Sequence, residues 1–180
     1  LVGENTMRHL NRLTLFLETK GFWWGVALLG TSLFVAALYW QYALNEEPCQ
    51  VCIQARLWVV AIALLGGLMS LLPHSRRLYT AGNSLLLLCA VGLGERSFYL
   101  YEIENFRGDG SCEFSLGMPD WFTVDRWLPS LFEVRNICSY TPEIAFGVSM
   151  AEALIGISLI VASLCGVNIL RSATGQLSPS

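Results

Sequence analysis

The chain has 180 residues, of which 54% are hydrophobic and only 14% are charged, with a formal net charge of -3. Soluble domains carry about 25% charged residues because a solvated surface needs them, so the charge deficit points to a membrane protein. The negative balance argues against a nucleic-acid-binding protein, which would need a basic face.

Four apolar segments are long enough to cross a bilayer as helices, which takes about 20 residues. In hydrocarbon every backbone polar group must be bonded within its own segment, so these runs form helices. The first is too long for the hydrophobic region of a signal peptide, which has about 7–15 residues. The predicted spans are residues 22–44, 53–72, 78–99 and 153–170.

Buried helices of a soluble bundle would show polar stripes at helical spacing, whereas residues 26–38 carry no charge on any face. We therefore predict an all-α membrane protein with a four-helix transmembrane bundle. Residues 1–180 are expected to form a single integral membrane domain, with outer loops at about residues 45–52 and 102–143.

Basic residues indicate the orientation of these spans. Lys and Arg concentrate in flanks that share one side if all four segments cross: Arg8, Arg12, Lys20, Arg76, Arg77 and Arg171. Short flanks rich in Lys and Arg stay in the cytoplasm. We expect both termini to be cytoplasmic and both loops to face outward.

The long outer loop is not uniformly polar. Apolar side chains recur in it at roughly helical spacing, interrupted by a proline: Trp121, Val124, Trp127, Leu128, Leu131 and Phe132, with Pro129. This pattern predicts a short amphipathic helix on the outer membrane surface. A loop that covers the helix ends is the alternative, and the two interpretations are compatible.

The six cysteines separate by predicted topology. Cys89 and Cys165 fall inside spans, where free cysteines act as small apolar side chains. The other four lie in the outer loops, in a compartment where disulfides persist. They are Cys49, Cys52, Cys112 and Cys138.

The C-x-x-C formed by Cys49 and Cys52 lies at the start of the second span. A disulfide there closes a very short loop and removes little chain entropy, so a redox role is favoured over a structural one. The N–H groups at the start of a helix also favour the thiolate form of a cysteine.

Arg56 lies one turn beyond Cys52 on the same helix face. A guanidinium at that depth is costly without a partner, so we expect it to stabilise the Cys52 thiolate or to bind a ligand carbonyl at the membrane edge. Snorkelling to lipid headgroups is the alternative. Arg96 lies at a similar depth and is either a second edge of this site or an interfacial anchor.

The pair Cys112 and Cys138 brackets the long loop. A bridge between them would either hold the loop in place or exchange with a soluble partner, and the spacing favours neither role. Four thiolates could in principle hold a metal, but an oxidising compartment disfavours that, and we predict no metal site. A merely cross-linked membrane protein is a further alternative.

Residues 48–56, Pro-Cys-Gln-Val-Cys-Ile-Gln-Ala-Arg, resemble the signature of the disulfide bond formation protein B (DsbB) family. The loop from Cys112 through residues 118–121 and 125–129 to Cys138 resembles that family too. The vitamin K epoxide reductase-like group is less similar, because its C-x-x-C is expected late in the bundle.

The resemblance implies a relay in the bacterial inner membrane. A reduced periplasmic DsbA-like thioredoxin-fold protein would attack Cys112, with Cys138 as the leaving group. Electrons would then pass to the pair Cys49 and Cys52. Cys52 would donate them to ubiquinone or menaquinone, which Arg56 would bind and polarise. A dedicated partner in place of a general DsbA is also compatible with the sequence.

Overall fold

Four long helices make up most of the computed structural model, which describes residues 20–73, 75–105, 116–119, 121–136, 143–145 and 147–174. They are α2 (Lys20–Ala43), α3 (Gln50–Leu71), α4 (Arg76–Glu104) and α7 (Met150–Ala173). Each is long and apolar enough to cross a membrane, which confirms the predicted all-α, four-helix membrane fold.

Helices α3, α4 and α7 begin earlier than the apolar runs, at residues 50, 76 and 150 rather than 53, 78 and 153. The reason is that side-chain caps, rather than the change from polar to apolar sequence, set their first turns. Ser75 caps α4 by accepting from the backbone N–H of Leu78, and Ser149 and Glu152 form a capping box at α7. Helix α4 also runs on to Glu104, beyond the predicted end at residue 99.

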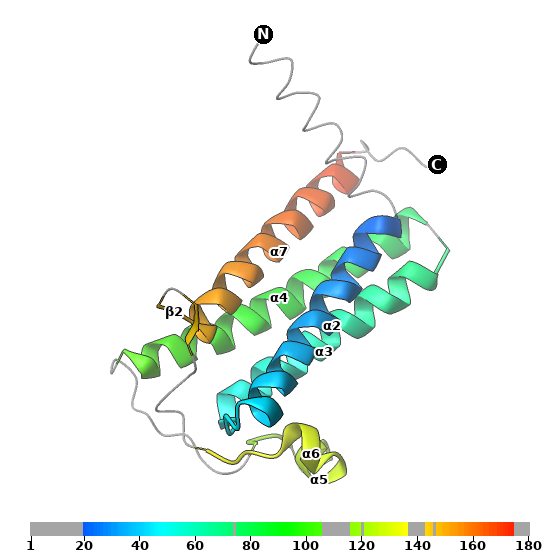
Figure 1. Ribbon diagram of the computed structural model, residues 1–180. Coiled ribbons are helices and arrows are strands. Elements are labelled where there is room, and N and C mark those ends of the chain that lie inside the picture. The colour runs from blue at the N-terminus through cyan, green and yellow to red at the C-terminus, as the bar shows by residue number, and fades with distance from the viewer. Residues whose placement is uncertain are drawn as a thin grey trace.

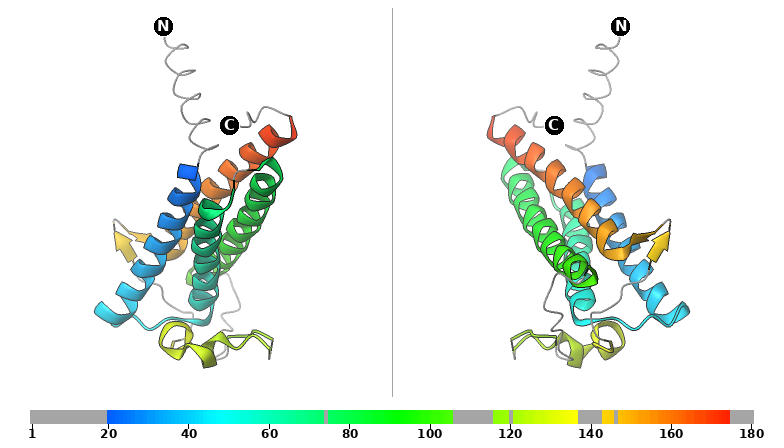
Figure 2. Two further views of the ribbon diagram at one scale, coloured as in Figure 1. Left: turned by 90° about the vertical axis from the view of Figure 1, so that its right-hand side faces the viewer. Right: turned by 90° about the vertical axis from the view of Figure 1, so that its left-hand side faces the viewer.

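Helix α2 packs on α3, α3 on α4, and α4 on α7 (Figures 1 and 2). Glycines bring the backbones of α2 and α3 into contact. A Cβ atom on Gly30 would lie 2.7 Å from the Ala63 nitrogen, and one on Gly66 would lie 2.5 Å from the Ala27 nitrogen. This close approach fixes which faces of α2 and α3 meet.

The two ends of the bundle differ in what they carry. Figure 1 shows the start of α2, the α3–α4 connection and the end of α7 at one end. The α2–α3 connection, α5 (Val124–Trp127) and α6 (Pro129–Phe132) lie at the other. Lys20, Arg76 and Arg171 therefore share one end and the C-x-x-C occupies the opposite one, as the predicted topology requires.

The segment with loop helices α5 and α6 has features of both predicted forms, a loop that covers the helix ends and an amphipathic surface segment. Leu116 and Phe132 are buried against Ile53 of α3, so this part of the loop covers a helix end. Trp121 and Trp127 are 77% and 59% exposed and form an outward apolar face. A membrane-surface contact through that face stays a prediction.

A short antiparallel ribbon precedes α7 and was not predicted. Strand β1 (Glu143–Ala145) pairs with β2 (Val148–Ser149), and Gly147 takes a positive φ of 77° in the turn between them. Glycine adopts this backbone conformation without steric cost. The ribbon leads directly into the capping box of α7.

Candidate functional site

Cys49 and Cys52 form a disulfide across the first turn of α3, with their Cα atoms 5.1 Å apart. Cys49 is the N-cap residue, and its Sγ accepts a hydrogen bond from the backbone N–H of Cys52 at 3.2 Å. Cys49 is only 2% exposed, packed among apolar residues of α4 and α7, whereas Cys52 is half-buried. The predicted position at a helix N-terminus is confirmed, and Cys52 is the more exposed of the two residues.

The outer loop returns to this C-x-x-C through its backbone. The N–H groups of Arg135 and Asn136 both donate to the Pro48 carbonyl oxygen, at 3.0 and 3.3 Å. Cys49 and Asn136 form a parallel β-bridge. The chain is thus held beside Cys49 only two residues before Cys138. No sequence signal pointed to this contact.

Cys112 and Cys138 themselves lie outside the described residues. Their pairing, their predicted redox roles and the four-thiolate alternative therefore stay as the sequence analysis left them.

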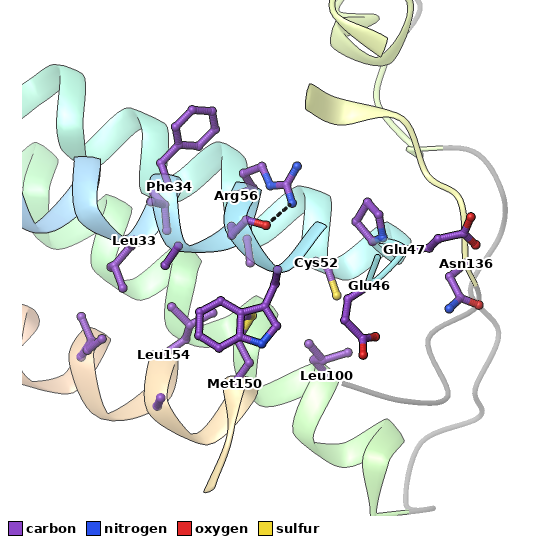
Figure 3. Close-up of a pocket in the computed structure, with 18 residues that line it drawn as sticks. Leu33, Phe34, Glu46, Glu47, Cys52, Arg56, Leu100, Asn136, Met150 and Leu154 are labelled. Carbon is purple, nitrogen blue, oxygen red and sulfur yellow. Dashed lines mark hydrogen bonds between the residues drawn. The ribbon is translucent and has the colours of Figure 1, made fainter. Parts of the chain in front are cut away.

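An apolar cavity of about 240 Å³ opens beside Cys52, between α2, α3 and α7 (Figure 3). Its walls carry aliphatic and aromatic side chains, among them Leu33, Phe34, Trp40, Leu154 and Ile157. Few of its lining residues are polar or charged: Glu46, Glu47, Cys52, Arg56 and Asn136. A mostly apolar cavity with a few convergent polar groups is the usual form of a small-molecule site.

Arg56 lies in this cavity and is only 6% exposed. Its Nη1 donates to Gln41 Oε1 at 2.7 Å and to the Leu131 backbone oxygen, and its Nη2 lies 3.5 Å from the Ala37 oxygen. Its Nε is buried without a hydrogen-bond partner in the described part of the chain. The burial contradicts the snorkelling alternative, because a snorkelling guanidinium would be exposed.

Gln41 is a site residue that the sequence analysis missed. It is buried on α2, and besides accepting from Arg56 it donates from Nε2 to the Ser130 oxygen at 3.3 Å. Tyr42 donates to the same Ser130 oxygen. The available signal was a glutamine amide within an otherwise apolar span, which needs a partner in a membrane.

Arg96 belongs to a different contact. It pairs with Glu95 at 2.6 Å and donates to Gln54 Oε1 at 3.1 Å, and it does not line the cavity. Gln54 in turn donates to the Leu116 oxygen at 3.0 Å. Arg96 is therefore not a second edge of the Arg56 site, and its role as an interfacial anchor stays a prediction.

A smaller polar cavity of about 140 Å³ adjoins the first and shares Glu47 and Pro48 with it. Arg135 lines this cavity and forms an ion pair with Glu133 at 2.8 Å. The hydrogen bond and the negative charge of Glu133 raise the pKa of Arg135 above its usual value. Arg135 therefore stays charged on the outer side of the site.

Comparison with known proteins gives a consistent result. The family model described as "Disulfide bond formation protein DsbB" matches residues 19–168. "Disulfide bond formation protein B 2" of Pseudomonas aeruginosa is 34% identical over 139 residues, covering 75% of this chain and 81% of the relative. The proteins named "Disulfide bond formation protein B" of Shewanella denitrificans and Burkholderia pseudomallei are 28% and 29% identical. These matches cover 83% and 81% of this chain and 89% and 86% of the relatives.

Proposed function

We propose the complete reaction of this chain, which belongs to the disulfide bond formation protein B family and is a multi-pass inner-membrane disulfide oxidoreductase. It reoxidises a periplasmic DsbA-like thioredoxin-fold protein by thiol–disulfide exchange. It then passes the electrons to a membrane quinone, either ubiquinone or menaquinone. The proposal includes a single membrane domain with both termini in the cytoplasm and the C-x-x-C at the periplasmic face.

The observation that carries the proposal is that Cys52 and Arg56 line one apolar cavity at the edge of the spans. The cavity suits a quinone, because a quinone ring is flat and apolar and its carbonyl oxygens accept hydrogen bonds. Arg56 brings a guanidinium charge to the cavity lining, where it can act on a ligand carbonyl oxygen. A quinone held there would accept two electrons and two protons, as many as one dithiol releases on forming a disulfide.

Each protein group then has a defined task. The partner's thiolate attacks Cys112 and Cys138 leaves, after which the Cys138 thiolate attacks Cys49. The backbone contact of residues 135–136 with Pro48 supports this order, since it brings the chain before Cys138 to the C-x-x-C. Cys52 leaves as a thiolate, which the N-terminal N–H groups of α3 stabilise.

The partner's second thiolate then displaces Cys112 and completes the partner's disulfide. The Cys112 thiolate attacks Cys138, which re-forms the loop disulfide and frees Cys49, so reduction of the C-x-x-C matches oxidation of the partner's dithiol. Cys49 and Cys52 later form their disulfide again as the electron pair leaves the site. Arg56 orients the ligand by hydrogen bonding and keeps a positive charge beside the oxygen that gains electron density.

Quinone reduction by purified protein, supplied with a reduced DsbA-type partner, tests the proposal. We expect turnover in the wild type and none in Cys52→Ser, because no thiolate then faces the cavity. Cys89→Ala is the matched control, since it removes a cysteine that lies outside the cavity lining and should keep turnover. Full activity of Cys52→Ser would refute the assignment. Stable, inert disulfides in the wild type would instead support a cross-linked structural protein.

A further inference from the structure

We propose that Tyr42 is a positioning residue for electron transfer between the outer loop and the C-x-x-C. Its hydroxyl, together with the amide of Gln41, holds the Ser130 carbonyl oxygen and keeps the end of the loop docked beside Cys49. This inference rests on the proposed relay and adds to it the contact that prepares the loop for exchange.

Helix α6 is too short to satisfy its own carbonyl groups. The last four carbonyl groups of any helix lack partners within it, and α6 has only four residues. Figure 1 shows α6 beyond the outer ends of α2 and α3, and side chains of these two helices provide the donors. Gln41 Nε2 donates to the Ser130 oxygen at 3.3 Å, and the Tyr42 hydroxyl donates to the same atom. Arg56 Nη1 donates to the next carbonyl oxygen, that of Leu131.

Tyr42 differs from the other two donors in its distance from the ligand cavity. Arg56 lines that cavity, and Gln41 accepts a hydrogen bond from Arg56. Tyr42 is 55% exposed and does not line it. A change at Tyr42 therefore tests the docking of the loop separately from the proposed quinone site.

The segment that follows Ser130 is held at two further points. Phe132 is buried against α3. The N–H groups of Arg135 and Asn136 donate to the Pro48 oxygen. Tyr42, Pro48 and Arg135 line the same small polar cavity, so both ends of this segment dock at one place. A hydrogen bond at the start of the segment thus stabilises the backbone contact at its end.

The exchange step explains why the loop needs to be held. Cys49 is only 2% exposed, so an attacking thiolate must be brought to it along a defined path. Asn136, two residues before Cys138, forms the β-bridge with Cys49 while the Cys49–Cys52 bond is intact. This is the state that the Cys138 thiolate attacks in the proposed relay. One sulfur–sulfur bond forms as another breaks and the Cys52 thiolate replaces that of Cys138, so Tyr42 neither gains nor loses a proton.

Two tyrosines of α2 provide a matched pair of variants. Tyr42→Phe removes the hydroxyl that donates to Ser130 and keeps the ring. Tyr39→Phe removes a hydroxyl three residues earlier, from a side chain that is 57% exposed and whose ring packs on Trp40. The Tyr39 variant should match the wild type in each measurement that follows.

Hydrogen–deuterium exchange of the full protein in detergent measures the docking directly. We expect Tyr42→Phe to raise the exchange rate of the peptide containing residues 135–136 by roughly 2- to 12-fold, the factor that the loss of one neutral hydrogen bond produces in an equilibrium constant. Peptides of α4 and α7 should exchange as in the wild type. A general loss of stability would instead raise exchange in those helices too.

Rapid mixing separates the two steps of the relay. Oxidised, quinone-free protein is mixed with a reduced DsbA-type partner, quenched with acid and alkylated, and the reduced Cys52 peptide is followed by mass spectrometry. Tyr42→Phe should slow its appearance by a factor similar to the change in exchange. Fully reduced protein mixed with one equivalent of a short-chain ubiquinone reports the last step alone, and there Tyr42→Phe should match the wild type.

Two results in Tyr42→Phe would overturn the inference: wild-type exchange of the loop peptide, or faster exchange with an unchanged appearance of reduced Cys52. Slower quinone reduction by the fully reduced variant would also contradict it, because the hydroxyl would then act on the ligand site. When the wild type reduces quinone and these expectations fail, the role of Tyr42 alone is refuted. A wild type that reduces no quinone would refute the proposed function and this inference together.

Discussion

Replacing Arg56 with methionine tests the central geometry of the site. The substitution keeps an unbranched apolar stem and removes the guanidinium, which bonds Gln41 Oε1 at 2.7 Å and the Leu131 oxygen. Two consequences follow from this geometry. A quinone loses its charged hydrogen-bond donor, and two acceptors inside the protein lose their partner.

The two consequences have separate magnitudes. A hydrogen bond to a charged group contributes about 1.5–3 kcal/mol, so the apparent affinity for quinone should fall by roughly 10- to 150-fold. Each acceptor left buried and unsatisfied costs about 1–3 kcal/mol, so the variant should also lose stability. Gln41→Leu keeps the guanidinium but removes its main neutral partner. This variant should therefore also lose stability, but its quinone affinity should fall less than that of Arg56→Met.

Steady-state quinone titrations at saturating reduced partner measure the first effect, and thermal unfolding in the same detergent measures the second. At saturating quinone, Arg56→Met should oxidise the partner far better than at low quinone. A folded Arg56→Met variant with an unchanged quinone dependence would refute the reasoning. The positive charge would then serve only to attach the outer loop.

The remaining predictions concern helix packing. Gly66→Ala should lower the free energy of unfolding by about 1–3 kcal/mol, because its Cβ would lie 2.5 Å from the Ala27 nitrogen. Gly67→Ala, with open space around it, should be neutral or slightly stabilising. Thermal unfolding of both variants measures the difference. Asn168→Leu removes the donor that bonds Asn83 Oδ1 at 3.0 Å and should cost about 0.6–1.7 kcal/mol, and wild-type stability would show that this bond contributes nothing. Cys165→Ala should keep quinone turnover, and its loss in a folded variant would contradict the apolar role of this thiol.

Much of the architecture could be predicted because it depends on local sequence. Apolar runs without charge mark the spans, and the residues around Cys49 and Cys52 form the first turn of α3, as expected. The position of Arg56 one turn deeper follows from helical periodicity alone. The helix boundaries were less predictable, because caps such as Ser75 and Ser149 extend helices into polar sequence.

The contacts between distant segments could not be predicted. That Gln41 faces Arg56 depends on the rotation of α2 against α3, which the close approach at Gly30 and Gly66 fixes. That Pro48 receives the backbone of residues 135–136 depends on how the outer loop folds back. Neither contact leaves a periodic signal in the sequence, so the residues that line the cavity could be identified only from the structure.

The hydrogen-bond partners of Arg56 explain how this buried arginine can keep its positive charge available to a ligand. Burying a guanidinium costs several kcal/mol unless hydrogen bonds replace its hydration. At Arg56 the replacements are a glutamine amide and backbone carbonyls, all of them neutral. A carboxylate in the place of Gln41 would have satisfied the same bonds and cancelled the charge. With neutral partners the hydrogen bonds are satisfied while the positive potential persists in the cavity beside Cys52, where an electron-accepting oxygen would need it.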